Sequence, residues 1–209
     1  MSFAYLLPES PENLLDYFAL VADLPYAMLL DSAAPHHVNS NYDILVCQPL
    51  ATLEAFGRRC VVQQTGTSRD LAAQLGQTEQ LENDPFQQLK TMQQQLLPVV
   101  APDACVLPFC GGALGYVGYD AGRTIEPMPD LALHDIGLPD LAFGIYAGGL
   151  VLDKQQRQLW YVDCRGDAKN RWLLQQQWFE QRRLQKTMDV AATAKHNNPP
   201  ILLPVFSLQ

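Results

Sequence analysis

The chain has 209 residues, 48% of them hydrophobic and 17% charged, so it can form one large domain or two small ones with a substantial core. Its net charge of -8 argues against a nucleic-acid partner, because phosphate binding needs a clustered positive surface. There is no basic signal-peptide start, no apolar run long enough to span a membrane, and no CxxC pair among the five cysteines. We expect a soluble, cytoplasmic protein that binds neither nucleic acid nor membrane.

The first half of the chain predicts one helix followed by strands. Ser10 and Pro11 form a helix start, because serine caps a first turn and proline fits the first helical position, and Pro25 closes the segment. The strands at 43–47, 50–56 and 60–64, with a turn at Gly57, predict a small antiparallel meander. The polar residues 65–83 predict a surface segment with one helical turn at most. The expected strands are a buried strand at 26–32, then 43–47, 50–56 and 60–64.

The second half alternates helices with strands. A second helix begins at Asp84-Pro85 and ends before Pro98, and a third covers about Asp167 to Met188, with Leu174, Trp178, Trp172 and Phe179 in two apolar rows. The expected strands are 105–109, the glycine-rich stretch from Gly111, and 143–153 with 158–163, which flank a hairpin turn at 154–157. Strands with helices at the margins predict an α+β fold built on antiparallel sheet.

Residues 111–126 read GGALGYVGYDAGRTIE and raise the question of a phosphate-binding loop. The best match to the dinucleotide-binding pattern GxGxxG begins at Ala113, where the first glycine of the pattern is missing, and no helical pattern follows it. The lysine of a P-loop is also absent from this stretch. Glycine in a strand lets another backbone approach closely, which favours a structural role, with an Asp120–Arg123 ion pair pinning the turn. The structural residues of this stretch are Gly111, Gly112, Gly115, Gly118, Tyr119, Asp120, Arg123 and Glu126.

One further segment, residues 29–44, is a candidate binding site. A strand ends at Asp31-Ser32, and a polar loop re-enters a strand at Tyr42-Asp43; such ends can converge on a small ligand, although ordinary turn hydrogen bonds are the simpler interpretation. The four histidines are scattered and no cysteine has zinc-type spacing, so no metal site is expected. From the residues alone, this is an α+β domain with no recognisable catalytic set.

Three segments carry a resemblance to a known family: LPYAMLLDS, NYDILVCQP and PFCGGALGYVGYDAGRTIEPMPD. They resemble the N-terminal domain of aminodeoxychorismate synthase component I, in the anthranilate synthase component I-like family, over roughly residues 10–180. The resemblance implies a β-sandwich-like pair of antiparallel sheets with helices packed outside. It also implies a non-catalytic domain at 1–190 and a linker at 191–209 toward a C-terminal chorismate-using domain, so we expect a truncated chain or a natural fragment.

The activity that the resemblance implies belongs to that second domain. In this family it binds chorismate and Mg²⁺ and replaces the 4-hydroxyl group with an amino group, using ammonia from a glutamine amidotransferase subunit, for para-aminobenzoate and folate synthesis. We therefore expect these residues to need no cofactor and to be inactive alone. Two alternatives remain: the N-terminal domain of anthranilate synthase component I, and a stand-alone amino-acid-binding module.

The resemblance further implies a tryptophan pocket in the first domain. Ser32 is placed to meet the amino group of the ligand, and the loop that includes Asn39 closes over the indole. Two positions depart from the family pattern: Asp31 stands where the tryptophan-inhibited branch has glutamate, and Asn39 stands where tyrosine can occur. Since the rest of the pocket comes from the second domain, these residues alone are expected to bind tryptophan weakly or not at all. The implied pocket residues are Leu30, Asp31, Ser32, Asn39, Ser40, Asn41 and Tyr42.

Overall fold

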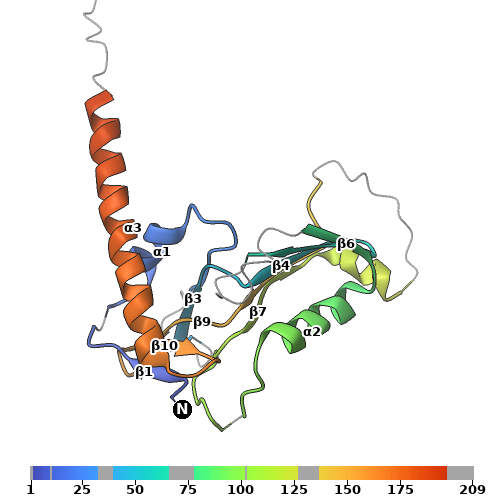
Figure 1. Cartoon of the computed structure of the whole chain (residues 1–209), viewed down its shortest axis with the longest axis horizontal. Helices are drawn as coiled ribbons and strands as arrows, with labels where there is room; N and C mark the ends of the chain where they lie inside the picture. Colours follow the sequence, from blue (N-terminus) through green and yellow to red (C-terminus); the bar gives the residue numbers. More distant parts are fainter. Residues whose placement is uncertain are drawn as a thin grey trace, which may run out of the picture.

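Two antiparallel sheets of five strands each, with helices packed against them, form the framework of the protein (Figure 1). This computed structural model describes residues 2–9, 11–32, 40–65, 78–101, 103–126 and 137–196. The expected α+β class with antiparallel sheets and helices packed outside is confirmed. No helix among the described residues combines the length and hydrophobicity that crossing a membrane requires.

The first sheet has the strand order β1-β10-β9-β3-β2. One of its faces is covered by α1 (Leu15–Val21) and the long α3 (Ala168–His196), which pack on each other and on the sheet. Leu45, Leu150 and Leu159 from the sheet share a core cluster with Trp172 and Phe179 of α3. The strands are β1 (Ala4–Leu6), β10 (Gln158–Asp163), β9 (Gly148–Asp153), β3 (Tyr42–Val46) and β2 (Met28–Leu30).

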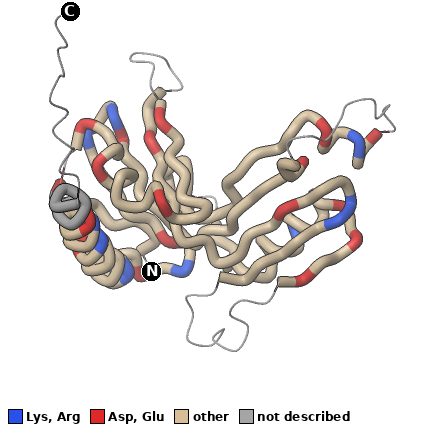
Figure 2. The backbone as a smooth tube through the Cα atoms, turned by 90° about the horizontal axis from the view of Figure 1, so that it is seen from above, with Lys and Arg blue, Asp and Glu red and all other residues tan. Residues whose placement is uncertain are grey.

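The second sheet has the order β6-β5-β4-β8-β7 and a core of its own. Helix α2 (Pro85–Leu96) covers it, and Met92 packs with Leu53, Cys60 and Ile145. The strands are β6 (Thr78–Glu82), β5 (Arg59–Gln64), β4 (Ala51–Phe56), β8 (Leu141–Tyr146) and β7 (Gly112–Val117). The two sheets with their helices lie side by side as two lobes (Figure 2).

The chain crosses between the sheets twice, and the two crossings run beside each other. One passes from β3 to β4, and the other passes from β8 to β9 through Ala147. Because Leu45 pairs with Leu150 and Ala51 pairs with Ile145, the two crossing chains form one antiparallel ribbon that is shared by both sheets. This ribbon fixes how the lobes are joined.

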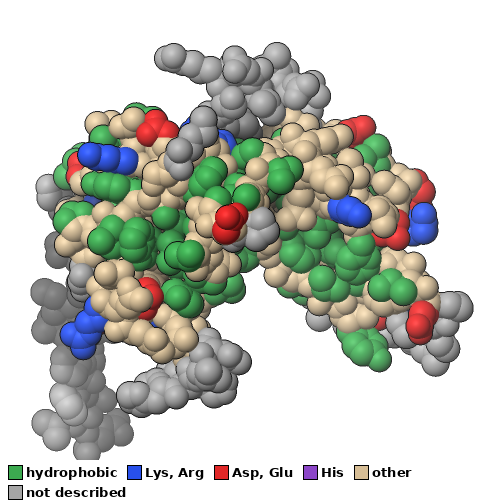
Figure 3. Space-filling view, turned by 90° about the horizontal axis from the view of Figure 1, so that it is seen from below, with side chains coloured by type: hydrophobic (Ala, Val, Ile, Leu, Met, Phe, Trp, Pro, Cys, Tyr) green, Lys and Arg blue, Asp and Glu red, His purple; other side chains and the backbone are tan. Residues whose placement is uncertain are grey.

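An apolar row crosses the first sheet on the face opposite the helices. In register, Leu6 pairs with Trp160, Trp160 with Val151, Val151 with Ile44, and Ile44 with Leu30. Since side chains alternate between faces along a strand, these five point away from the helix-covered core residues beside them. Leu6 and Leu30, at the ends of the row, are 42% and 48% exposed. Figure 3 shows groups of hydrophobic side chains on both halves of one face of the molecule.

Helix α2 starts as expected, whereas the other two helices differ at their ends. The Asp84 carboxylate accepts hydrogen bonds from the backbone N–H groups of Phe86 and Gln87, and Pro85 is the first helical residue. Helix α1 begins later than expected, at Leu15, where the Asn13 side chain accepts a 3.0 Å bond from the Leu15 N–H. Helix α3 continues past Met188 to His196, and so includes the start of the expected linker. Leu174, expected on its buried side, is 70% exposed.

Several strand predictions were wrong. The segment at 105–109 forms no strand, and Val106 is 93% exposed. The segment at 26–32 contains only the short edge strand β2, which is half-exposed rather than buried. The expected meander is split, because β3 joins the first sheet while β4 and β5 join the second. The strand expected at 143–153 is two strands in different sheets, and the polar segment at 65–83 contains β6 in its described part.

Candidate functional site

The residues implied for ligand binding lie close together at the edge of the first sheet, where β2 ends and β3 begins. Leu30 is the last residue of β2, with Asp31 and Ser32 directly after it, while Ser40 and Asn41 lead into β3, which begins at Tyr42. Asn39 lies outside the described residues. The turn between β9 and β10 lies beside them, because Tyr42 pairs with Asp153.

Ser32 is held by two hydrogen bonds to the strand that follows. Its backbone N–H donates to Oδ1 of Asp43 at 2.9 Å, and its hydroxyl donates to the carbonyl oxygen of Tyr42 at 2.7 Å. Because the hydroxyl hydrogen is used in this way, the Oγ atom presents only its lone pairs to an approaching molecule. Ser32 therefore offers a hydrogen-bond acceptor.

A buried ion pair lies behind Ser32. Asp43 is 1% exposed, and its Oδ1 atom lies 3.2 Å from the Lys154 Nζ atom, which also donates a 2.7 Å bond to the Ser32 carbonyl. Asp31 lies 3.8 Å from the same Nζ atom, with a side chain that is 44% exposed. Two carboxylates around one ammonium give the site a net charge of about -1, so it favours a cationic group.

Asn41 fastens the loop to the neighbouring turn. Its carbonyl oxygen accepts a 2.8 Å bond from the Lys154 N–H, and its side-chain oxygen accepts a 2.8 Å bond from Nε2 of Gln155. Sequence reasoning included Asp43 only as part of the candidate segment at 29–44, without a ligand role, and did not include Lys154. Asp43 did carry a signal, since it is an acidic residue on the core face of an apolar strand, opposite Leu152.

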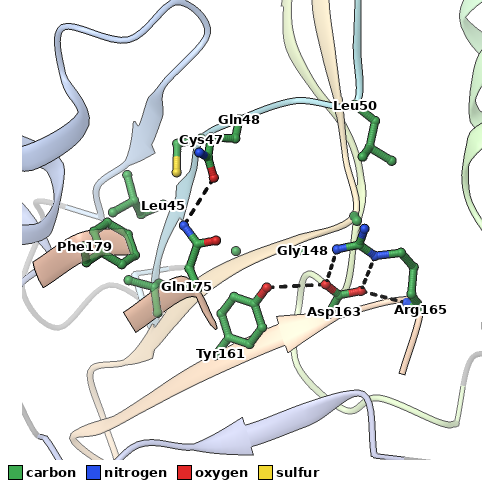
Figure 4. Close-up of a pocket in the computed structure, with 13 residues that line it drawn as sticks. Leu45, Cys47, Gln48, Leu50, Gly148, Tyr161, Asp163, Arg165, Gln175 and Phe179 are labelled. Carbon is green, nitrogen blue, oxygen red and sulfur yellow. Dashed lines mark hydrogen bonds and ion pairs between the residues drawn. The ribbon is translucent and has the colours of Figure 1, made fainter. Parts of the chain in front are cut away.

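A cavity of about 130 Å³, separate from the site at Ser32, lies where the sheets meet (Figure 4). The implied ligand residues do not line it, and no sequence pattern indicated it, because its walls come from four distant segments. Its lining includes Leu45, Cys47, Gln48, Gly148, Gln175 and Phe179.

The two charged side chains that line this cavity, Asp163 and Arg165, form an ion pair with each other. Asp163, fully buried, accepts bonds from Nε and Nη2 of Arg165 at 2.9 and 2.7 Å (Figure 4). This hydrogen-bonded pairing with the carboxylate raises the pKa of Arg165, and burial raises the pKa of Tyr161 beside it. The pair is therefore suited to hold the β10 end in place, and it leaves little unpaired charge for a ligand.

The glycine-rich stretch forms β7 and a 3₁₀ helix, Tyr119–Thr124. Gly111 has φ of +90°, and a Cβ atom at Gly115 would lie 2.0 Å from the Ala142 carbonyl oxygen, so close backbone approach explains both glycines. Arg123 Nη2 lies 2.9 Å from Asp120 Oδ1, which is the ion pair that the spacing predicted. The remaining residues of the motif lie along the same stretch: Gly112 opens β7, Gly118 precedes the 3₁₀ helix, Tyr119 begins it and Glu126 follows it.

The chain is similar to several known proteins. It is 40% identical over 174 residues to aminodeoxychorismate synthase component 1 of Salmonella typhimurium, covering 81% of this chain and 35% of that protein. It is 36% identical over 176 residues to the Escherichia coli protein of the same name, covering 83% and 36%. It thus spans about a third of the length of these relatives. Anthranilate synthase component 1 of Synechocystis is 28% identical over 155 residues, covering 72% and 28%.

A solved structure and a family model complete the comparison. The crystal structure of anthranilate synthase component I from Streptococcus pneumoniae superimposes with a TM-score of 0.45 and 20% identity, covering 94% of this chain and 37% of that one. The family model described as chorismate binding enzyme matches residues 26–201, which is most of the chain. The chain therefore belongs to the chorismate binding enzyme family.

Proposed function

We propose that this chain is the non-catalytic N-terminal part of an aminodeoxychorismate synthase component I. With a glutamine amidotransferase subunit, the whole enzyme converts chorismate to 4-amino-4-deoxychorismate for para-aminobenzoate and folate synthesis. The observation that carries the proposal is the difference in identity. Three relatives named aminodeoxychorismate synthase component 1 are 36–40% identical over long alignments, whereas three anthranilate synthases are 26–28% identical.

The side chains described here support a non-catalytic role. The charged groups at both candidate sites are engaged with one another, as in the Asp43–Lys154 and Asp163–Arg165 pairs. The family resemblance implies Mg²⁺ for catalysis, but no group of three or more histidine, cysteine or acidic side chains among the described residues is placed to hold a metal ion. We propose that a further part of the enzyme supplies the Mg²⁺ site.

The apolar row across the first sheet supports a platform role. A sheet face that carries Leu6, Trp160 and Leu30 at partly exposed positions is suited to contact another protein layer, because covering such side chains removes apolar surface from water. We propose that the chorismate-using domain of the same subunit packs beside this face.

The site at Ser32 fits the ammonium group of an amino acid, and we propose tryptophan as its ligand. The Ser32 Oγ lone pairs accept hydrogen bonds from the ammonium, and the nearby Asp31 and Asp43 carboxylates supply the negative field. The indole would be enclosed beside Tyr42, which begins β3 directly next to Ser32.

Product analysis of the subunit that contains this chain tests the proposed activity. Supplied with chorismate, ammonia and Mg²⁺, the subunit is expected to form 4-amino-4-deoxychorismate, with the new amino group para to the ring carboxylate. Formation of anthranilate, which carries its amino group in the ortho position, would show that the chain belongs to the anthranilate synthase branch instead.

A further inference from the structure

Three of the five cysteines meet at the junction of the two lobes. Cys105 and Cys110 lie in the segment between α2 and β7, and Cys164 directly follows β10. All three line one cavity of about 300 Å³, whose wall also includes Gly111. Cys105 and Cys110 are partly exposed, whereas Cys164 is buried, so the first two residues are the more accessible to small molecules.

Contacts of the sulfur atoms define this cluster, which we call the thiol cluster (Cys105, Cys110 and Cys164). The Cys110 thiol donates a 3.9 Å bond to the carbonyl oxygen of Phe3, and the Cys105 and Cys164 side chains lie close enough to influence its ionisation. Next to them, a Cβ atom at Gly111 would lie 2.9 Å from the sulfur of Cys164. Glycine at this position therefore lets the backbone that carries Cys110 lie directly against Cys164.

All the cysteines are free thiols in the structure. We propose that Cys105 and Cys110 form a redox-sensitive pair that closes to a disulfide. Both side chains line the same cavity and are only five residues apart in one connecting segment, so the two sulfur atoms can be brought together as thiol–disulfide exchange requires. Closure links two points of the segment that joins α2 to β7, and this segment rests on Phe3 of the first lobe. The disulfide therefore restrains the junction between the lobes.

The oxidant is a low-molecular-weight disulfide. The thiolate of Cys105 attacks one sulfur of the oxidant, the oxidant's S–S bond breaks, and one small thiol leaves. The thiolate of Cys110 then attacks the Cys105 sulfur in the mixed disulfide and displaces the second small thiol. The two protons of the cysteine thiols end on the two released thiols, so two cysteines are oxidised while one small disulfide is reduced.

The surroundings of Cys110 make the second step slow at neutral pH. Burial first, then the neighbouring Cys105, raise the pKa of Cys110 to about 12, and Cys164 and Asp163 act in the same direction. Because only the thiolate attacks, closure is expected to accelerate by about tenfold per pH unit below that pKa. Burial also raises the pKa of Cys164 to about 11, so Cys164 is likewise a slow attacking group.

Mass spectrometry after oxidation tests the pair. The reduced chain is incubated with oxidised glutathione between neutral and mildly alkaline pH, its remaining thiols are alkylated, and it is digested with trypsin. Cys105 and Cys110 share the tryptic peptide 91–123, whereas Cys164 lies in 158–165. The expected result is a loss of two alkylatable thiols, from five to three, with peptide 91–123 lighter by two hydrogen atoms and unalkylated.

Variants separate the roles of the two thiols. Cys110→Ser is expected to retain glutathione on Cys105 as a stable mixed disulfide, and Cys105→Ser is expected to block closure. Cys47→Ala, at a cysteine that lines the other cavity, is the matched control and is expected to close like the parent chain. Circular dichroism of each reduced variant shows that it is folded. A peptide 91–123 joined to 158–165, a mixed disulfide in the parent that persists even at the mildly alkaline end of the pH range, or closure in Cys105→Ser would each overturn the proposal.

Discussion

The Tyr26 hydroxyl donates a 2.7 Å hydrogen bond to the Glu54 carboxylate and so ties the loop before β2, in the first lobe, to β4 of the second sheet. The same residue accepts a 2.6 Å bond at its carbonyl oxygen from the buried Tyr146 hydroxyl. Tyr26 makes these contacts with a backbone φ of 58°, a left-handed conformation that residues other than glycine adopt only at an energetic cost. The two bonds therefore stabilise both the local backbone and the union of the lobes.

Removal of the Tyr26 hydroxyl is expected to weaken that union. Tyr26→Phe should lower the free energy of unfolding by about 1–3 kcal/mol, because the bond goes to a charged, half-buried carboxylate. Urea titration followed by circular dichroism gives the value. Tyr119→Phe is the matched control, since Tyr119 is 91% exposed, and it should change stability little. Equal effects of the two substitutions would show that the Tyr26 bond contributes nothing specific.

Loss of Lys154 should leave the buried Asp43 carboxylate without its cation. We expect Lys154→Met to lower the free energy of unfolding by about 1–3 kcal/mol, because a buried charge deprived of its partner is costly. Lys90→Met on the exposed side of α2 is the control. The double variant Lys154→Met with Asp43→Asn should regain part of the free energy of unfolding that Lys154→Met loses. If it regains none, the two residues are not coupled.

The close approach of β7 to β8 predicts that Gly115 does not tolerate a side chain. A Cβ atom there would overlap the Ala142 carbonyl oxygen, so Gly115→Ala should separate the strands. We expect it to lower the free energy of unfolding by about 1–3 kcal/mol, measured as a fall in the melting temperature. Gly57→Ala offers a comparison, because its Cβ meets nothing within 4 Å and only its φ of +59° opposes the change. A smaller loss at Gly115 than at Gly57 would contradict the packing argument.

Tryptophan binding should depend on Ser32. Calorimetry on the subunit that contains this chain is expected to show binding that weakens by about tenfold in Ser32→Ala, since one hydrogen bond to a charged ammonium is lost. The Thr91→Ala variant, altered at an exposed hydroxyl on α2 of the other lobe, serves as the control and should bind like the parent. Undiminished binding in Ser32→Ala would remove the assigned contact without touching the fold.

Sequence patterns predicted the elements whose signals are local. The start of α2 follows from Asp84 and Pro85, which act within one turn, and the hairpin turn at 154–157 follows from polar residues between two apolar strands. Strand β6 was missed because its side chains are mostly exposed, so it has no apolar alternation and exists by pairing with β5. The apolar segment 105–109 was wrongly predicted as a strand, since no sheet edge is paired with it.

Local sequence patterns could not predict features that depend on contacts between distant segments of the chain. The passage from β3 in one sheet to β4 in the other crosses only a few residues, and nothing local distinguishes it from a hairpin. Likewise, Lys154 reaches Asp43 across a separation of 111 residues, and this contact exists only because β9 pairs with β3. The residues implied for the ligand were nevertheless brought to one sheet end, except Asn39, which is not described.

Amination of chorismate measures the central claim most directly. The 209-residue chain and the longer subunit that contains it are each supplied with chorismate, ammonia and Mg²⁺, and 4-amino-4-deoxychorismate is quantified by chromatography. The account predicts product from the longer subunit and none from the chain alone. Turnover by the chain alone would contradict it, because the reacting groups would then have to lie among these residues.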